Sequence, residues 1–453
     1  MSQGQRWNRR QALRRACAAA SGLLAAPLVV KANVLGLADS VAPSERITLG
    51  FIGVGMMGRG HVHHLLEYAQ TQILAVCDVD RWRRDDAKNT VEQGYASQAA
   101  SGQYKGCSAY NDLRDLLARP DIDAVVIATG DRWHALATIL AAKAGKDVYC
   151  EKPVSLTICE NLAMMEHIDR YGRIFQAGLQ QRSTPEFMRA CELVQKGRIG
   201  QVRNVYVTSP GTCYDVNFAP EPVPDTLDWD LWLGPAPWRP FNRVFHHVGP
   251  PKFVVPWHVC PDFGGGNLTS NAVHAFDVVQ WGLGMDESGP VEITPPETGK
   301  VPLLTYKYAN DTLLQVTPRL DPSHHTIPPG WDANTPIQVF GALFVGDSGW
   351  IHVGRQGFLE AYPREILAET PASTEPDRPV TNHHLNWLSC IRTRERSACS
   401  VSAGCRSTIV AQLGCIAHWT QRSLQWNPEK FEFVGDVEAN LMRQRTMREP
   451  WTV

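Results

Sequence analysis

The chain has 453 residues, 43% of them hydrophobic and 20% charged, which is enough for two or three domains with sizeable cores. Its 44 Lys and Arg residues nearly balance 46 Asp and Glu residues, giving a formal net charge of −2. This balance excludes the strongly basic composition that is typical of nucleic-acid-binding proteins, so we expect no nucleic-acid partner.

Residues 1–45 are predicted to be an export signal followed by a linker. The adjacent residues Arg9 and Arg10 precede an uncharged, mildly apolar run over 16–30. This run is too short to span a bilayer comfortably, and no other window is long and apolar enough, so we expect no stable membrane span. The arginine pair and the Leu13 that follows it favour a twin-arginine-type signal over an ordinary basic leader or an uncleaved anchor. Such a signal exports folded proteins, which predicts a periplasmic location.

A dinucleotide-binding loop is predicted directly after this region. The apolar run ITLGFIGV over 47–54 predicts a strand, and a GxGxxG pattern at its end opens a predicted helix. The first glycine permits a tight turn, the second lets the backbone approach a pyrophosphate, and the third lets helix and strand pack closely. The free amides of the helix N-terminus then hold the phosphates. The loop residues predicted to bind the cofactor are Gly53, Gly55, Met56, Met57 and Gly58.

Asp78 ends the next strand-like run, QILAVCDVD, 20 residues after Gly58. A carboxylate at this point binds the adenosine ribose hydroxyls and repels a 2′-phosphate, which favours NAD over NADP. The nearby residues Arg81, Arg83 and Arg84 weigh against this preference, but a solvated helix start explains them more simply. The alternation of strand and helix patterns predicts a doubly wound parallel sheet.

Several motifs resemble the Gfo/Idh/MocA family of sugar and cyclitol oxidoreductases, and VYCEKPVS is the most specific of them. The resemblance also covers IATGDRWHA, AGLQQRS, DWDLWLGPAP and FGGGNLTSNAVHAFDVVQWGLG, and it extends from about residue 46 to the C-terminus. It implies an α/β protein with a Rossmann NAD-binding domain over 46–155. A second α/β domain over 156–453, with a large open and mostly antiparallel sheet, would bind a carbohydrate substrate and form a homo-oligomer. Its C-terminal helices would return to the first domain.

Lys152 of the Glu-Lys-Pro run is the first predicted catalytic residue. It lies at the carboxyl edge of the predicted parallel sheet, where ligands bind, and its ammonium group can stabilise alkoxide character as a hydride leaves. The resemblance also places Glu151, Trp133, His134 and Gln180 at the cofactor. An unusual peptide bond is typical of the family at this point, and a cis bond before Pro153 is the expected form.

His274 and Asp277 in HAFDVVQW are the other predicted catalytic residues. Their spacing places both on one helical face, so Asp277 can orient the imidazole. The family pattern has an aspartate four residues before this histidine, whereas here that position is Ser270. A hydroxyl does not supply a carboxylate's charge, which leaves Asp262 and Asp277 as candidate substitutes.

No metal site is predicted. The 12 cysteines are scattered without a CxxC pair, and they indicate neither a zinc site nor an assignable disulfide. The adjacent residues His383 and His384 begin a predicted helix, on which neighbouring side chains point apart.

Two enzymatic functions stay open, and a non-catalytic sugar-binding protein is the weakest alternative because Lys152 and His274 are both present. The first is an NAD-dependent oxidoreductase acting on a sugar, polyol or glycoside hydroxyl. The second is a redox-neutral glycosidase, in which oxidation at C3 acidifies the C2 proton, the C1 substituent is eliminated, water adds and the same hydride returns. Export favours a tightly bound cofactor in either case, because no NAD pool is expected outside the cytoplasm.

Overall fold

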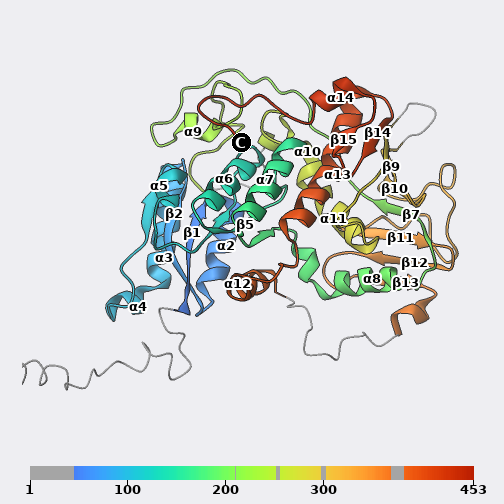
Figure 1. Cartoon of the computed structure of the whole chain (residues 1–453), viewed down its shortest axis with the longest axis horizontal. Coiled ribbons are helices and arrows are strands. Elements are labelled where there is room, and N and C mark those ends of the chain that lie inside the picture. Colours follow the sequence, from blue (N-terminus) through green and yellow to red (C-terminus); the bar gives the residue numbers. More distant parts are fainter. Residues whose placement is uncertain (1–44, 210, 251–255, 297–302, 369–381) are drawn as a thin grey trace, which may run out of the picture. The chain divides into compact units, whose positions relative to one another are not determined.

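The computed structural model describes residues 45–209, 211–250, 256–296, 303–368 and 382–453 (Figure 1). The twin-arginine-type sequence and nearly all of the predicted linker lie outside these residues. Residues Ile47–Val453 form one unit that is built around two sheets. Within the described ranges, no helix has the length and apolar character needed to cross a bilayer.

The first sheet is parallel and has six strands in the order β3-β2-β1-β4-β5-β6. This is the Rossmann-type order, and the prediction for the N-terminal half is confirmed. Its central strands are apolar on both sides because helices cover both faces. The sheet continues to Ala177, beyond the domain boundary predicted at residue 155. The strands are β1 (Ile47–Ile52), β2 (Thr71–Cys77), β3 (Ser108–Tyr110), β4 (Ala124–Ile127), β5 (Asp147–Cys150) and β6 (Phe175–Ala177), and the helices between them are α2 (Met56–Leu66), α3 (Arg81–Gly94), α4 (Ala96–Ala100), α5 (Leu113–Leu117), α6 (Asp131–Lys143) and α7 (Ile158–Arg170).

The second sheet has nine strands in the order β13-β12-β11-β7-β10-β9-β8-β14-β15. Only the β7–β10 pair is parallel among these described strands, so the mostly antiparallel sheet is confirmed. The strands are β7 (Val202–Val207), β8 (Glu292–Thr294), β9 (Thr305–Lys307), β10 (Leu313–Val316), β11 (Ala342–Gly346), β12 (Gly349–Val353), β13 (Leu359–Tyr362), β14 (Leu424–Asn427) and β15 (Glu432–Phe433).

Helices bury one face of this sheet and a loop packs on the other. The core on the helical side includes Phe187, Phe276 and Phe344, while Leu320, Trp331 and Ile337 of loop 317–341 pack against the opposite face. Oligomerisation through the sheet stays a prediction. The remaining helices are α8 (Pro185–Gln195), α9 (Trp229–Leu233), α10 (Gly266–Ser270), α11 (Ala272–Gly282), α12 (His383–Thr393), α13 (Val401–Thr420) and α14 (Val437–Leu441), with short 3₁₀ turns η3 (Gln180–Ser183), η4 (Pro256–Val259) and η5 (Arg364–Ala368).

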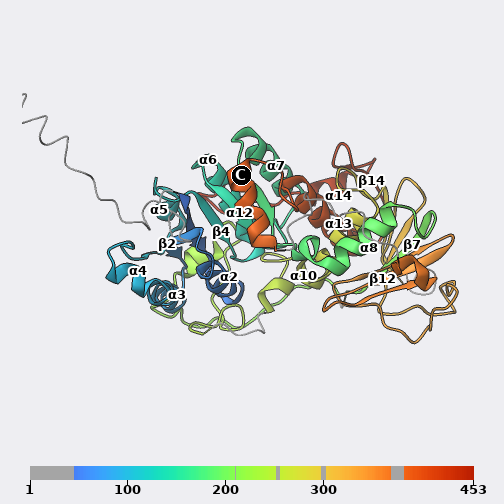
Figure 2. The ribbon, with the colours of Figure 1, turned by 90° about the horizontal axis from the view of Figure 1, so that it is seen from below.

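The C-terminal helices α12 and α13 pack against the Rossmann half. Trp387 of α12 is fully buried in the cluster that contains Phe51 and Tyr149. Helix α13 lies against α7 and β6, and it also packs on α11 of the second half. Helix α13 therefore ties the two halves together (Figure 2).

A long connection between β7 and α10 lies over the Rossmann half, and we call residues 211–250 the roof segment. The backbone of Thr226 accepts a 2.9 Å hydrogen bond from Arg81, and the amide of Asp228 donates to Val79 at 3.0 Å. Figure 1 shows α9 of this segment beside β2 and α5. The segment holds its shape through an aromatic cluster of its own, in which Trp229 and Trp232 stack with centroids 4.4 Å apart.

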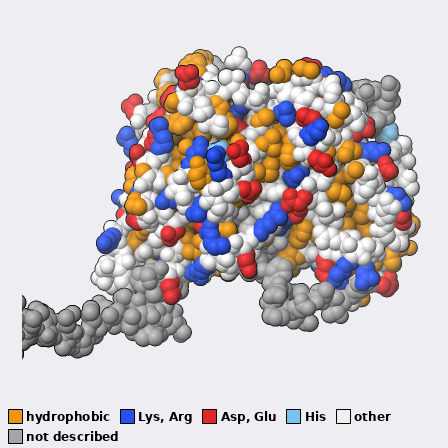
Figure 3. Space-filling model, in the orientation of Figure 1, with side chains coloured by type: hydrophobic (Ala, Val, Ile, Leu, Met, Phe, Trp, Pro, Cys, Tyr) orange, Lys and Arg blue, Asp and Glu red, His pale blue; other side chains and the backbone are white. Residues whose placement is uncertain are grey.

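Acidic and basic side chains are interspersed on the face shown in Figure 3. No broad field of one sign covers the described part of that face, in keeping with the near-neutral composition.

Candidate active site

The glycine loop joins β1 to α2, and each of its glycines has a separate structural reason. Gly53 has a φ of 84°, and a Cβ there would lie 2.7 Å from the carbonyl carbon of Ala128. A Cβ on Gly58 would collide with the carbonyl oxygen of Gly53. The nearest atom to a Cβ on Gly55 is an Arg83 nitrogen at 3.5 Å, so that glycine leaves its face open. The three glycines thus match the three uses expected of a dinucleotide loop.

A cavity of about 700 Å³ runs along this loop and the carboxyl edge of the parallel sheet. Its volume lies in the range of small-molecule and cofactor sites, about 300–1,000 Å³. Four residues predicted for the site do not line it, namely Gly58, Gln180, His274 and Asp277. The predicted residues that do line it are Gly53, Gly55, Met56, Met57, Asp78, Trp133, His134, Glu151 and Lys152.

The cavity has the groups that a dinucleotide needs. Asp78 is held at the end of β2, because its carboxylate accepts the amide of Val54 at 2.8 Å and that of Asp80 at 2.9 Å. Its oxygens face the cavity, where ribose hydroxyls can donate to them. The N-terminus of α2 has no side-chain cap, which leaves backbone amides for phosphate oxygens.

Arg83 is not the solvated side chain that the sequence suggested. Its Nε donates to the carbonyl of Gly249 at 3.2 Å and its Nη2 to that of His247 at 2.8 Å. The roof segment thus holds a guanidinium against the cavity, a contact that no local pattern in the sequence indicates.

Lys152 lies where the two halves of the protein meet. Its Nζ donates a 2.8 Å hydrogen bond to the backbone carbonyl of Ser270 on α10, and the bond between Lys152 and Pro153 is cis, as expected. An ammonium has three N–H donors, so others are available to a ligand oxygen in the cavity. Ser270 thus orients Lys152 through its backbone and also lines the cavity.

Glu151 is engaged by protein groups. Its Oε1 accepts 3.0 Å hydrogen bonds from His61 and from the amide of Gln180, and its Oε2 accepts the Lys152 amide at 3.2 Å. Burial raises the pKa of Glu151, but the hydrogen bond and charge of His61 together with the charge of Lys152 outweigh it and lower the pKa to about 2. The amide of Gln180 also donates to Tyr149, which explains why it supports Glu151 instead of facing the cavity.

The adjacent histidines of α12 have structural partners. His383 binds the Ala177 carbonyl and the Ser183 hydroxyl, each at 2.8 Å, while His384 contacts His61 at 2.8 Å. In the part of the chain that the structure describes, no set of three or more His, Cys, Asp or Glu side chains is placed to hold a metal.

Trp133 and His134 of α6 support the cavity wall. Trp133 donates through Nε1 to the carbonyl of Leu231 in α9 at 2.9 Å. The ring of His134 lies 2.6 Å from the Pro153 carbonyl and 3.1 Å from that of Thr129. Both therefore hold neighbouring loops in place, while their nicotinamide contacts stay predictions.

His274 is buried behind the cavity. Its Nδ1 has no hydrogen-bond partner within the described ranges, and the ring of Phe340 meets it edge-on with centroids 5.5 Å apart. Burial, together with the charges of Lys152 and Arg355, lowers the pKa of His274 well below its ordinary value. The imidazole is therefore neutral at physiological pH, and its predicted catalytic role is untested.

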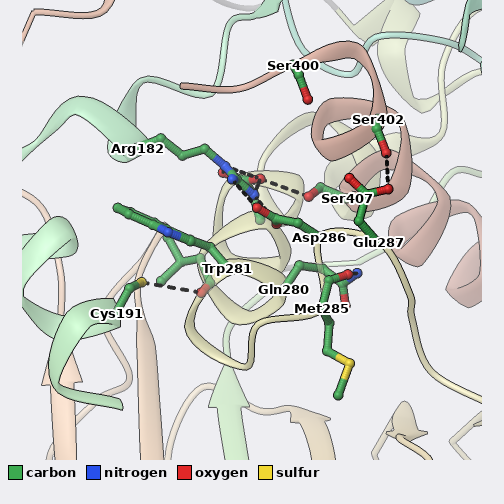
Figure 4. Close-up of polar contacts among 12 residues, drawn as sticks. Arg182, Cys191, Gln280, Trp281, Met285, Asp286, Glu287, Ser400, Ser402 and Ser407 are labelled. Carbon is green, nitrogen blue, oxygen red and sulfur yellow. Dashed lines mark hydrogen bonds and ion pairs between the residues drawn. The ribbon is translucent and has the colours of Figure 1, made fainter. Parts of the chain in front are cut away.

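Asp277 points to a different neighbour from the one expected. Its carboxylate accepts Arg182 at 2.8–2.9 Å and the Ser407 hydroxyl at 2.8 Å, and no hydrogen bond within the described residues joins it to His274. Arg182 also binds Asp286, which lies beside it in Figure 4. Burial alone would lower the pKa of Arg182, but the two carboxylates raise it well above its ordinary value. This buried ion network gives Asp277 a structural role, and its predicted catalytic role is untested.

Two sequence models match this architecture half by half. The model described as "Oxidoreductase family, NAD-binding Rossmann fold" matches residues 47–179. The model described as "Oxidoreductase family, C-terminal alpha/beta domain" matches residues 211–309 and 351–453. The chain belongs to the Gfo/Idh/MocA oxidoreductase family.

Curated relatives of this Gfo/Idh/MocA oxidoreductase bear two kinds of name. A "glycosyl hydrolase family 109 protein" from Shewanella pealeana is 35% identical over 193 residues, covering 37% of this chain and 40% of that protein. An "inositol 2-dehydrogenase/D-chiro-inositol 3-dehydrogenase" from Lactiplantibacillus plantarum is 27% identical over 200 residues, covering 43% of this chain and 54% of that one. The chain thus spans about half the length of the curated relatives it matches.

Solved structures share the fold. Myo-inositol 2-dehydrogenase from Lactobacillus plantarum has a TM-score of 0.54 and 16% identity, covering 84% of this chain and 99% of that one. Levoglucosan dehydrogenase, solved with NADH and levoglucosan, has a TM-score of 0.55 and 17% identity with the same coverage. Both are similar to the Gfo/Idh/MocA oxidoreductase described here in architecture alone.

Among the cavity residues that sequence reasoning missed in this Gfo/Idh/MocA oxidoreductase, three carry polar or aromatic groups of special interest. Asp131 and Arg132 begin α6, and Trp232 comes from the roof segment. Asp131 follows the end of β4, so the rule that ligands bind at the carboxyl edge of a parallel sheet would have indicated it. Arg132 stacks over Trp232, with its guanidinium carbon 3.7 Å from the ring centroid, a pairing across 100 residues of chain.

We expect Asp78→Asn to lower affinity for NAD and to reduce discrimination against NADP, each by about 10-fold. The substitution removes the charge that repels a 2′-phosphate but keeps an oxygen for the Val54 amide, and hydrogen bonds to charged groups contribute about 1.5–3 kcal/mol. Titration of cofactor-stripped protein with each dinucleotide measures both effects. Asp115→Asn, on α5 and outside the cavity lining, is the control; unchanged NAD affinity in Asp78→Asn contradicts the ribose assignment.

Proposed function

We propose that this protein transfers a hydride between a carbohydrate or polyol hydroxyl and a nicotinamide cofactor, NAD in preference to NADP, that stays bound. The observation that carries the proposal is the cavity that joins the glycine loop and Asp78 to Lys152 beneath the roof segment. The inositol and levoglucosan dehydrogenases among its relatives and structural neighbours support a polyhydroxylated substrate.

Residues at different positions along the cavity have different roles in this proposal. The glycine loop and α2 hold phosphates, and Asp78 holds the ribose diol at one end. Lys152 lies at the other end, where its ammonium can donate to the substrate oxygen and stabilise negative charge as the hydroxyl is oxidised. When bound, the nicotinamide supplies the hydride acceptor and donor.

The roof segment supports retention of the cofactor. Asp80, the N-cap of α3, accepts both the His246 ring at 3.0 Å and the amide of Gly249 at 3.1 Å, and Asp80 and His246 are buried. We infer that these contacts hold the roof segment in place and slow release of the cofactor. We propose that the protein is exported through its twin-arginine-type signal with the cofactor already in place.

The redox-neutral glycosidase is the second candidate, because a relative named as a glycosyl hydrolase is 35% identical over 193 residues. In that cycle, oxidation at C3 is followed by loss of the C2 proton and the C1 substituent. Water then adds, and the hydride returns to C3. No net oxidation occurs, which suits a protein that keeps one cofactor outside the cytoplasm.

One experiment separates the two candidates. The purified protein is denatured and its supernatant is assayed for nicotinamide. The native protein is then incubated in D₂O, without added NAD, with myo-inositol, levoglucosan, free sugars and aryl glycosides. We expect about one nicotinamide cofactor per protein chain. With a free sugar or polyol as substrate, each site should form one NADH and then stop.

Many turnovers of aryl glycoside cleavage, with deuterium at C2 of the product, would replace the first candidate by the second. A protein that is free of nicotinamide and binds added NAD weakly would contradict retention in both.

A further inference from the structure

Four carboxylates line the cavity, and in three of them each oxygen already accepts a hydrogen bond from the protein, although a carboxylate oxygen can accept more than one. Asp78 accepts two backbone amides, Asp112 accepts the amide and guanidinium of Arg114, and both oxygens of Glu151 are bonded. Asp131 differs, because its Oδ2 is buried and has no hydrogen-bond partner in the described ranges of the chain. An unpaired buried carboxyl oxygen is costly unless a ligand or a proton satisfies it.

The surroundings of Asp131 keep this oxygen free. Asp131 is 2% exposed, and Gly264 packs close to it: a Cβ on Gly264 would lie 3.1 Å from Oδ2 and 2.6 Å from the carbonyl oxygen of His258. The adjacent Arg132 turns away, because its Nε and Nη2 donate to the carbonyl of Trp232 at 2.9 and 2.6 Å. The neighbouring guanidinium therefore does not hold the carboxylate in an ion pair.

The candidates named from the sequence are held elsewhere. Asp262 pairs with Arg239, and Asp277 is bound by Arg182 and Ser407. Neither lines the cavity. Within the described residues, Asp131 is thus the one cavity carboxyl with a free oxygen.

The charges around Asp131 suit proton transfer near neutral pH. Burial raises the pKa of Asp131 to about 7, the positive charges of Lys152 and Arg132 oppose that rise, and Glu160 of α7 adds to it. The backbone carbonyl of His258 in η4 lies near Asp131 Oδ2, because both atoms surround the position that a Cβ on Gly264 would take. A carboxyl whose pKa lies near the working pH is suited to general acid–base catalysis.

We propose that Asp131 is the acid–base carboxyl of this active site, exchanging a proton with the substrate hydroxyl that Lys152 contacts. The inference rests on the proposed function. In oxidation, the carbon–hydrogen bond breaks and its hydride passes to the nicotinamide. The hydroxyl proton passes to the carboxylate of Asp131, and a carbonyl forms. In reduction the hydride returns, and the carboxylic acid gives its proton back to the oxygen.

The first test needs no substrate. Infrared spectra of the NAD-loaded protein are recorded at least one unit below and above pH 7. We expect a carboxylic acid band that is lost as pH rises through about 7 in the wild type and is missing in Asp131→Asn. Asp262→Asn should keep the band. If Asp131→Asn kept the band and lost it over the same pH range as Asp262→Asn, the proposal would be overturned. This outcome can be reached without a known substrate.

The second test uses whichever compound of the panel above reacts fastest. Asp131→Asn should slow single-turnover reduction of the bound cofactor ~10²–10⁴-fold at unchanged cofactor content, and the rise of the wild-type rate with pH through about 7 should vanish. Formate should partly restore the rate of Asp131→Ala by replacing the missing carboxylate, and it should not affect Lys152→Ala. Full activity in Asp131→Asn would refute the assignment. So would a failure of formate to restore Asp131→Ala, if the pH profile of Asp131→Asn also matched that of the wild type.

Discussion

Replacing Lys152 with alanine is expected to lower turnover by ~10²–10⁴-fold, the usual contribution of a positioned proton donor. The Nζ of Lys152 contacts only the Ser270 carbonyl among the described hydrogen bonds, so its other donors face the cavity. Loss of the ammonium removes the group that stabilises negative charge on the substrate oxygen. The dinucleotide loop is untouched, so bound nicotinamide should remain at the wild-type level, which denaturation and assay of the supernatant measures.

Lys143→Ala is the matched control, because Lys143 is exposed at the end of α6 and should be replaceable without effect on turnover. A fall in nicotinamide content that equals the fall in rate would instead assign Lys152 to cofactor binding. Wild-type turnover in Lys152→Ala would remove it from the mechanism.

Arg182→Met is expected to lower the free energy of unfolding by about 3–5 kcal/mol, because it leaves a buried charge without its partner. Arg182 and Asp277 have side-chain exposures of 4% and 1%, whereas Asp286, at 33%, can still be hydrated. Asp277 would keep only Ser407. Urea unfolding followed by both fluorescence and circular dichroism measures the loss and checks that the transition is two-state.

The surface pair Arg203–Asp347 supplies the control, since both side chains are 49% exposed and such pairs contribute about 0–1 kcal/mol. Adding Asp277→Leu to Arg182→Met should recover part of the loss, because no buried charge then stays unpaired at that position. If Arg182→Met and Arg203→Met were equally stable, the network would not have the structural role inferred for Asp277.

Local pattern predicted the Rossmann half of this protein well. The glycine loop is a short pattern of closely spaced positions: Gly53 has a positive φ, and a Cβ on Gly58 would collide with Gly53 five residues earlier. Asp78 and Lys152 each follow a strand, so the geometry of a parallel sheet brings them to one edge. The mostly antiparallel sheet of the second half was expected from the family resemblance.

Contacts between distant segments were not predictable in this way. Asp277 shares a helical face with His274, yet Arg182, 95 residues away, takes its carboxylate. Burial explains this pairing, because leaving the buried guanidinium of Arg182 unpaired costs more free energy than leaving the neutral imidazole of His274 without a carboxylate. Arg83 was likewise unpredictable from local pattern. It anchors the roof segment by donating to carbonyls more than 160 residues away. The catalytic assignments themselves stay predictions.

The roof segment also bears on modularity. Residues between 47 and 155 form one wall of the cavity, and the roof segment, residues 211–250, contributes to the other. The buried Asp80–His246 contact joins the two. Exchanging Rossmann domains between relatives at the apparent domain boundary would therefore separate residues that contact one another. Chimeras that alter cofactor preference should carry their own residues 211–250 along with the glycine loop, because a foreign roof would remove the His246 and Gly249 partners of the buried Asp80.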